Sequence, residues 1–530
     1  MKPISTLEFG FSDAENYNRR ENKDLFNKIF VKNIYLEQLL RPNTFFLMGE
    51  KGTGKTAYAV FLSNNDYKDT VSILKYIRET DYQKFVTLKK EKHLQLSDYT
   101  SIWKVIILLL LSQSIDADEL DHNPFSRNKR LKAIRQAIDE YYKNAFAPEI
   151  IYALNLIENT TEAAELISKY LKMGEEHSLS SSFQESKFQV NLLFIQNQFE
   201  KALSDIKIKE NHLLFIDGID IRPGRIPYGD YLDCIKGLAN AIWSINNDFF
   251  SKIRDSKGRF RVVLLMRPDI FNSIGLQNQT NKVQDNSVLL EWRTTYPEYR
   301  SSYLFEMADK ILSSQQDMVV PTGKSWDYYL PWKSSTTSPD RRFDDSFIHF
   351  LRISYSRPRD IVAMLKILQK NFSQSNKSSN DVFSEKDFNN KAVQNTFSEY
   401  LMGGIKDQLS FYYSDKHSEM FLHFFEYLKG RIKFNYADYM QFHDLFIGHL
   451  ASYNDGIPEF IRNPDTFLQF LYDTNIICYI EMLDTGDPLF RWCYRERNQA
   501  NICPKVKKDE IYMIHYGLAK SLNVGHRELI

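Results

Sequence analysis

The chain has 530 residues, more than one ordinary hydrophobic core holds, so its length predicts roughly two to four domains. Its 68 basic and 68 acidic residues balance, which excludes a global electrostatic field that would attract nucleic acid or a membrane. The longest apolar run, residues 105–111, is far shorter than the roughly 20 residues of a membrane-spanning helix, and the N-terminus lacks a signal-peptide pattern. The 4 cysteines form no C-x-x-C pair, so we expect reduced thiols in a cytoplasmic protein without membrane contact.

The first functional element in chain order is a phosphate-binding loop. Residues 44–48 (TFFLM) predict a buried strand, and residues 56–62 (TAYAVFL) begin a helix. The segment between them fits the pattern G-x-x-x-x-G-K-[ST] with Gly49, Glu50, Lys51, Gly52, Thr53, Gly54, Lys55 and Thr56. Such a loop binds a nucleoside triphosphate, here expected to be ATP, through its backbone N–H groups and the helix dipole.

Two side chains of this loop carry specific roles. Lys55 is expected to reach the β and γ phosphates, and the Thr56 hydroxyl is expected to be a ligand of Mg²⁺. The alternative is a glycine turn that fits the pattern by accident.

The segment between this loop and the next core strand is far longer than a minimal βαβ unit needs, so we expect an insertion. Its pattern is helical at residues 103–111, 131–142, 150–157 and 163–173, and residues 178–182 (SLSSS) predict a flexible joint. The insertion either packs on the core or forms a surface for a partner.

The second core strand, residues 212–217, ends at Asp217, which we expect to bind Mg²⁺. Many ATPases of this kind carry Glu directly after this aspartate, where this chain has Gly218. Asp220 is therefore the nearest candidate to orient the attacking water, with the alternative that it stabilises the following turn.

A third strand, residues 261–266, follows a helical stretch, and the alternation predicts a parallel α/β sheet. Arg267 follows this strand as a candidate γ-phosphate sensor, or as a structural partner of Asp269. Further on, Arg357 and Arg359 stand at the start of a predicted helix, where cations are unfavourable unless an anion is near. A bound γ-phosphate is one such anion, and pairing with Asp360 is the alternative.

These segments, GEKGTGKT, LLFIDGID, VVLLMRPDIF, LLEWRTTY and SRPRDIV, together resemble a bacterial group of P-loop ATPases allied to the STAND and AAA+ classes. Several members look like phage-defence or prophage-exclusion proteins, and the Fun(Z)-type exclusion protein of temperate phages is the nearest likeness. The resemblance covers residues 30–370 and, more loosely, the C-terminal part. It implies Lys55 and Thr56 on phosphates and Mg²⁺, Asp217 on Mg²⁺, Arg267 as a first sensor, and Arg357 or Arg359 as a second.

The last part of the chain predicts a winged-helix-like module. A short helix at residues 467–471 precedes two strands, residues 476–481 and 489–494, around the turn at 484–487. The second strand and the residues after it are rich in cations that could contact a DNA backbone, or be merely solvated: Arg491, Arg495, Arg497, Lys505, Lys507 and Lys508.

The sequence therefore predicts an α/β parallel-sheet P-loop core with a helical insertion, a helical lid and a C-terminal winged-helix-like domain. The expected boundaries are 1–82 for the N-terminal segment and P-loop, 83–205 for the insertion, 206–300 for the rest of the core, 301–372 for the lid, and 382–530 for the C-terminal domain.

The expected function is a Mg²⁺-dependent ATPase acting as a conformational switch in bacterial or prophage antiviral defence. The alternatives are a DNA-binding regulator or loader whose shape is set by ATP, and a nucleotide sensor with negligible turnover. The expected partners are ATP, a phage or host protein trigger, DNA on the basic module, and further copies of the chain joined through ATP-bridged interfaces.

Overall fold

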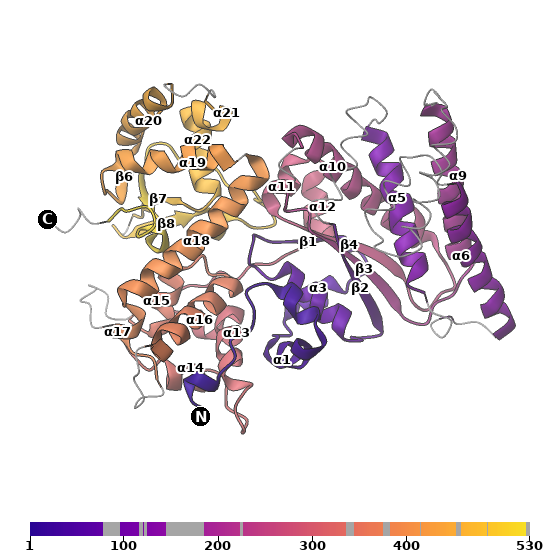
Figure 1. Cartoon of the computed structure of the whole chain (residues 1–530), viewed down its shortest axis with the longest axis horizontal. Helices are drawn as coiled ribbons and strands as arrows, with labels where there is room; N and C mark the ends of the chain where they lie inside the picture. The colour runs from indigo at the N-terminus through magenta and orange to yellow at the C-terminus, as the bar shows by residue number, and fades with distance from the viewer. Residues whose placement is uncertain are drawn as a thin grey trace, which may run out of the picture. The chain divides into compact units, whose positions relative to one another are not determined.

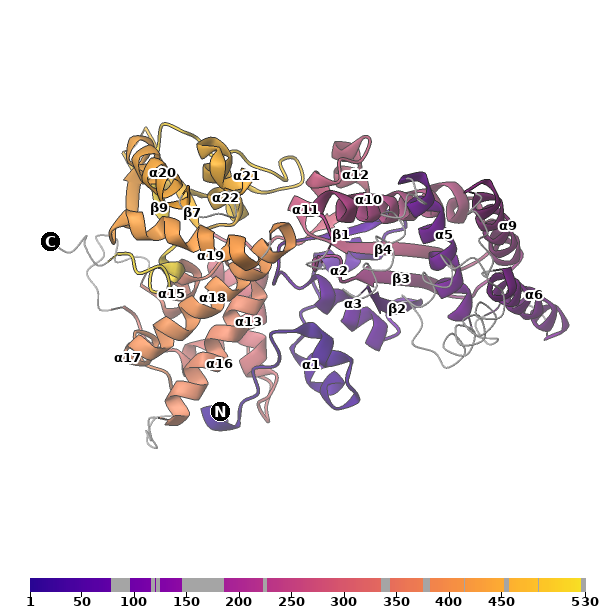
Figure 2. The same ribbon diagram turned by 45° about the horizontal axis from the view of Figure 1, so that its top comes forward.

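The computed structural model describes residues 1–77, 96–115, 120, 124–144, 185–222, 226–334, 344–374, 382–413, 415–451, 457–484 and 486–525. These residues form two compact units, whose elements are labelled in Figures 1 and 2. The sheet unit comprises Gln38–Met48 and Tyr58–Val288. The C-terminal unit comprises Met1–Glu37, Gly49–Ala57 and Leu289–Ile530, and so includes the P-loop.

The sheet unit is built on a five-stranded sheet in the order β2-β3-β4-β1-β5. The described pairings β2–β3, β3–β4 and β4–β1 are parallel, which confirms the predicted α/β core. Every residue of β4 is buried, as the continuous apolar run of a central parallel strand requires. The strands β2 and β5 were not predicted. The strand bounds are β1 Phe46–Met48, β2 Thr70–Tyr76, β3 Asn211–Asp217, β4 Phe260–Met266 and β5 Ser287–Leu289.

Helices cover both faces of this sheet. In Figures 1 and 2, α3 (Lys55–Asn64) lies on one face and α10 (Tyr228–Ser244) on the other. Helix α10 packs against α5 (Leu96–Gln113), which in turn contacts α9 (Glu185–Ser204), and α9 contacts α6 (Pro124–Asn144). The apolar run of α5 is buried by these contacts. Two short helices, α11 (Pro268–Ser273) and α12 (Gln279–Asn286), follow β4.

The predicted helices at residues 103–111 and 131–142 are confirmed as parts of α5 and α6. The predicted segments 150–157, 163–173 and 178–182 lie outside the described residues.

The first half of the C-terminal unit is helical. Near the N-terminus lie the short helix α1 (Lys23–Ile29) and α2 (Ile34–Leu39), which ends just inside the sheet unit. After β5 the helices are α13 (Tyr303–Ser313), α14 (Lys324–Tyr329), α15 (Ser346–Ile353), α16 (Pro358–Gln374), α17 (Glu385–Phe388) and α18 (Lys391–Tyr412). Rings of Phe305, Trp326 and Phe347 form an edge-to-face cluster at their centre. Helix α16 packs against both α13 and α18.

The second half of this unit adds a four-stranded sheet in the order β6-β9-β7-β8, with antiparallel pairing. The predicted helix and hairpin are confirmed: Asn463 caps α22 by accepting a hydrogen bond from Thr466 N (3.0 Å), and β7 pairs with β8. Phe421, Phe424, Phe446 and Phe467 are buried and contribute an aromatic core to this half of the unit. The elements are α19 Asp415–His423, β6 Lys433–Asn435, α20 Tyr436–Leu450, α21 Glu459–Arg462, α22 Pro464–Asp473, β7 Ile477–Met482, β8 Pro488–Trp492, α23 Cys493–Glu496 and β9 Ile511–Ile514.

Within the described residues, no helix combines the length and apolar character needed to cross a membrane.

Candidate nucleotide site

The P-loop has the backbone conformation that its glycines were expected to permit. It follows β1 directly in the chain and leads into α3, which begins at Lys55. Gly52 and Gly54 have φ angles of 90° and 95°, in the left-handed region where a Cβ is strained. Thr53 closes a turn inside the loop, because its N–H and its hydroxyl both donate to Glu50 O, at 3.2 and 2.8 Å.

Lys55 is folded onto the beginning of this loop. Its ammonium donates to Gly49 O (2.9 Å) and Glu50 O (3.3 Å), and only 6% of the residue is exposed. These carbonyls position the positive charge of Lys55 inside the loop. Two positive-φ glycines, a lysine held by the loop and a following helix N-terminus together fit the phosphates of ATP.

Asp217 occupies the last position of β3 and is largely buried. Its carboxylate accepts a hydrogen bond from the Gly218 N–H at 2.8 Å. Gly218 has a φ of 95°, and a Cβ there would lie 2.4 Å from the backbone oxygen of Ile77. Packing against the residue that follows β2 therefore excludes any side chain at position 218, including the glutamate considered in the sequence analysis.

Asp220 lies in the turn after β3. The Tyr231 hydroxyl, from α10, lies 2.7 Å from Ile219 O and 3.2 Å from Ile221 O, and so fixes the backbone on both sides of Asp220. A catalytic role for Asp220 stays a prediction.

Arg267 follows β4 and is 2% exposed. Its Nε donates to Asp269 at 3.0 Å, and its terminal nitrogen pairs with the second oxygen of the same carboxylate. The structure thus contains the ion pair that was the alternative to a sensor role. Phosphate sensing by Arg267 stays a prediction.

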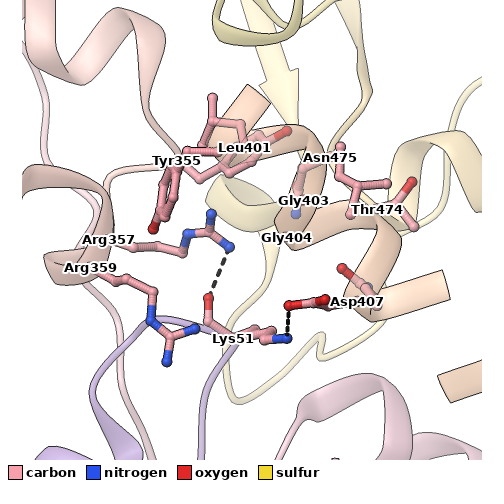
Figure 3. Close-up of a pocket in the computed structure, with 13 residues that line it drawn as sticks. Lys51, Tyr355, Arg357, Arg359, Leu401, Gly403, Gly404, Asp407, Thr474 and Asn475 are labelled. Carbon is pink, nitrogen blue, oxygen red and sulfur yellow. Dashed lines mark hydrogen bonds and ion pairs between the residues drawn. The ribbon is translucent and has the colours of Figure 1, made fainter. Parts of the chain in front are cut away.

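Arg357 and Arg359 both lie against the P-loop, but their surroundings differ (Figure 3). Arg357 donates to Lys51 O (2.8 Å) and, through two nitrogens at 3.0 Å each, to both oxygens of Asp360. Asp360 is fully buried and also accepts from Tyr355 N and the Tyr400 hydroxyl. Burial alone would lower the pKa of Arg357, but the charge of Asp360 raises it above its usual value.

Arg359 has no such carboxylate. Its backbone N–H donates to Gly52 O (3.3 Å) and its Nε donates to Ser12 O (2.9 Å). Both arginines therefore contact the loop through its carbonyl oxygens, whereas phosphates would be bound by its N–H groups. Of the two candidates for the second sensor, Arg359 has the guanidinium that is not neutralised by an ion pair within the described residues.

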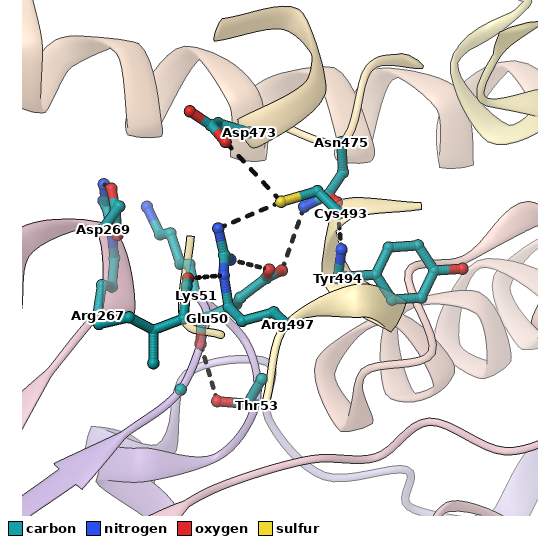
Figure 4. Close-up of polar contacts among 12 residues, drawn as sticks. Glu50, Lys51, Thr53, Arg267, Asp269, Asp473, Asn475, Cys493, Tyr494 and Arg497 are labelled. Carbon is teal, nitrogen blue, oxygen red and sulfur yellow. Dashed lines mark hydrogen bonds and ion pairs between the residues drawn. The ribbon is translucent and has the colours of Figure 1, made fainter. Parts of the chain in front are cut away.

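The C-terminal module also contacts the P-loop, which the sequence did not predict (Figure 4). The Glu50 carboxylate pairs with Arg497 and accepts a hydrogen bond from the Asn475 amide at 3.3 Å. Arg497 is buried and also donates to Ile502 O (2.8 Å).

Two other segments of the C-terminal unit contact the same loop. Lys51 pairs with Asp407 of α18 at 2.6 Å, and Trp292 Nε1 donates to Thr53 O at 2.8 Å. No local sequence signal links these residues, because the pairs come from distant segments.

Most of the predicted basic patch is neutralised within the chain. Arg491 pairs with Glu481 (2.8 Å) and Glu496 (3.2 Å), Lys507 with Glu481, Lys508 with Asp465 (2.6 Å), and Arg497 with Glu50. Hydrogen bonds from Lys507 and Arg491 lower the pKa of Glu481, so that this carboxylate stays charged. Cations paired in this way have less charge to offer a DNA backbone.

Comparison of the chain with protein-family models, curated proteins and solved structures finds no significant match.

Proposed function

We propose that the chain is a Mg²⁺-dependent ATPase that acts as a conformational switch. The observation that carries this proposal is the geometry of the P-loop: two glycines at positive φ and a lysine held at the loop carbonyls, directly after β1 and before α3. In this proposal Lys55 and the loop N–H groups bind the phosphates, and Thr56 is a ligand of the Mg²⁺ ion.

The strand order of the sheet unit supports the proposal. β1, β3 and β4 are parallel, so their carboxyl ends lie at the same edge, where open α/β sheets bind ligands. Asp217 ends β3, and Arg267 follows β4, the strand between β1 and β3. Asp217 is the proposed Mg²⁺ carboxylate, while water activation by Asp220 and phosphate sensing by Arg267 belong to the same proposal.

The contacts that hold the loop in the C-terminal unit support the proposed switch. Glu50, Lys51 and Gly52 contact residues of α16, α18 and the segment after α23 through side chains and carbonyls. A nucleotide that reorients the loop N–H groups must move these carbonyls as well, because each peptide unit is rigid. Binding and hydrolysis of ATP would thereby shift the lid and the C-terminal module between two arrangements.

ATP binding and steady-state hydrolysis with Mg²⁺ test this proposal directly. Wild-type protein is expected to bind and hydrolyse ATP, Lys55→Ala to lose both, and Lys333→Ala, at an exposed lysine, to retain both. Absence of ATP binding by correctly folded wild-type protein would refute it.

Two finer parts of the proposal depend on the sequence alone. A winged-helix role for α22 and the β7–β8 hairpin is consistent with the helix–hairpin order, but the ion pairs of the basic patch favour contact within the chain over contact with DNA. A role in antiviral defence stays a prediction based on the resemblance.

A further inference from the structure

Two backbone N–H groups of the P-loop have no acceptor among the described residues. They belong to Gly52 and Gly54, whereas the N–H of Thr53 between them donates to Glu50 O and closes the loop (Figure 4). Unused donors at positive φ angles are the groups that a bound phosphate accepts from in loops of this kind. The direction of these two N–H groups therefore decides how well the loop binds a phosphate.

The direction of the Gly54 N–H is set by a tryptophan outside the loop. Trp292 Nε1 donates to Thr53 O at 2.8 Å and is the only donor to that oxygen within the described residues. A trans peptide unit is planar, and its C=O and N–H point to opposite sides. Because Thr53 O and Gly54 N belong to one peptide unit, an indole that holds the oxygen directs the N–H away from Trp292.

The Gly52 N–H is directed in the same way, because Lys51 O accepts a hydrogen bond from Arg357 at 2.8 Å. The two outside donors differ in their chemistry. Arg357 has a charged side chain with several N–H groups, whereas the indole is neutral and uses its single N–H on Thr53 O. Trp292 can therefore act on a phosphate only through the peptide unit that it holds.

The indole is itself fixed before any ligand binds. Trp292 is 8% exposed, and its ring contacts that of Tyr35, with 6.5 Å between the centroids. The Tyr35 hydroxyl donates to Glu291 O at 2.7 Å. On the other side of Trp292, the Arg293 side chain donates to Arg495 O at 2.8 Å. All of these residues belong to the C-terminal unit, which also contains the loop.

We propose that Trp292 is a positioning residue of the nucleotide site. It holds the Thr53–Gly54 peptide unit so that the Gly54 N–H meets a phosphate group of the nucleotide, and Tyr35 supports the indole. This inference rests on the proposed function and adds to it a residue outside the G-x-x-x-x-G-K-[ST] pattern. A donor that is oriented in advance raises affinity, because the loop need not be ordered when the phosphates bind.

Isothermal titration with ADP and Mg²⁺ tests this role without requiring turnover. Trp292→Phe keeps an aromatic ring but removes the N–H, and we expect it to bind ADP about tenfold more weakly, the effect of one lost hydrogen bond. Trp326→Phe is the matched control, because Trp326 is buried too and its indole donates to Ser346 Oγ at 3.0 Å, outside the loop. This control should lower the melting temperature and keep the wild-type affinity for ADP.

Steady-state ATP hydrolysis adds a readout that a purely structural role would not give. A phosphate contact that is present both before and during hydrolysis contributes to binding more than to the chemical step. Trp292→Phe is therefore expected to raise KM about tenfold and to change kcat by less than about twofold. A lower kcat at unchanged KM would contradict the assignment.

Tyr35→Phe is a milder variant that carries the test if Trp292→Phe does not fold. It removes one hydroxyl at a half-buried position and should weaken ADP binding about threefold, because it acts on the loop through the indole.

Wild-type affinity for ADP in folded Trp292→Phe, or in Tyr35→Phe if Trp292→Phe does not fold, would overturn the assignment and leave the proposed function standing. An equal loss of affinity in Trp292→Phe and Trp326→Phe would show a general effect of destabilisation and would overturn it too. If the wild-type protein binds neither ADP nor ATP, the proposed function fails and the assignment fails with it.

Discussion

Arg497 and Glu50 form a largely buried ion pair although 447 positions of sequence separate them. The pair joins the second residue of the P-loop to the residue that follows α23. Their side chains are 7% and 15% exposed, so each charge is poorly hydrated without the other. This pair is the most direct link between the loop and the C-terminal module, and it lies entirely within the C-terminal unit.

Removing one partner of this pair is expected to be costly. Arg497→Met should lower the free energy of unfolding by about 3 kcal/mol, because it leaves the Glu50 carboxylate without its cation. The double variant Glu50→Gln, Arg497→Met should recover part of that loss. Urea unfolding of wild type, the single variants Glu50→Gln and Arg497→Met, and the double variant gives the coupling energy, and simple additivity would show that the pair contributes nothing.

Asp360 is expected to be essential for the stability of the helical lid. Asp360→Asn should destabilise the protein by about 3 kcal/mol, because it leaves the buried Arg357 guanidinium uncompensated. Asp407→Asn is the matched control: Asp407 is 62% exposed, and its pair with Lys51 is expected to contribute less than about 1 kcal/mol. Urea unfolding measures both, and similar effects from the two variants would contradict this account of Asp360.

Arg357, just before α16, and Arg359, within α16, are expected to have different roles. Measuring both the stability and the ATP turnover of their alanine variants tests this. Arg357→Ala is expected to destabilise the protein, since it removes a buried ion pair and the hydrogen bond to Lys51 O. Arg359→Ala, which breaks no ion pair, should leave the melting temperature nearly unchanged and lower ATP turnover if Arg359 is the second sensor. Normal turnover in Arg359→Ala would remove it from the sensor assignment.

Asp217, at the end of β3, and Asp220, in the turn that follows, should affect ATP hydrolysis in different ways when each is replaced. Asp217→Asn is expected to weaken Mg²⁺-dependent hydrolysis strongly, with ATP binding retained in the absence of Mg²⁺. Asp220→Asn should slow turnover at unchanged Mg²⁺ dependence if Asp220 orients water. Steady-state rates over a magnesium titration distinguish the two, and full activity of Asp220→Asn would assign that residue to the turn alone.

The burial of His515 is expected to make the folded protein less stable in acid. The residue is buried between the rings of Tyr355 (4.5 Å) and Trp492 (4.8 Å), and its Nδ1 accepts a hydrogen bond from Gly517 N. Burial, and then the positive charge of Arg495, lower the pKa of His515 to about 3. The unfolded chain takes up a proton near the ordinary pKa of about 6.5, whereas the folded chain does not.

Stability from this residue is therefore complete above about pH 6.5 and declines, by up to about 1.4 kcal/mol per pH unit, as the pH falls towards 3. Urea unfolding between pH 7.5 and about 5 should show a shallower acid decline in His515→Gln than in wild type. Equal slopes in wild type and His515→Gln would show that His515 does not take up a proton on unfolding.

Local patterns were sufficient to predict the parallel strands, the glycine-dependent loop after β1 and the helix–hairpin of the C-terminal module. Each of these depends on neighbouring residues: Gly52 and Gly54 set the loop, and the apolar runs of β3 and β4 set buried strands. β2 and β5 were missed, because β2 is half exposed and β5 is three residues long, so neither has the continuous apolar run of a central strand.

Only the tertiary structure decided which charged side chains form ion pairs with one another. The sequence showed Arg357 and Arg359 as an equivalent pair, and only the fold gives Asp360 to one of them. It showed Arg497 as a surface cation of a basic patch, whereas the fold buries it against Glu50. It also gave no reason for Gly218, which the carbonyl of Ile77 explains. Sequence alone determined which chemistry the loop offers, because that depends on backbone conformation within eight residues. Which charges are neutralised depends on contacts between distant segments, and these exist only once the chain has folded.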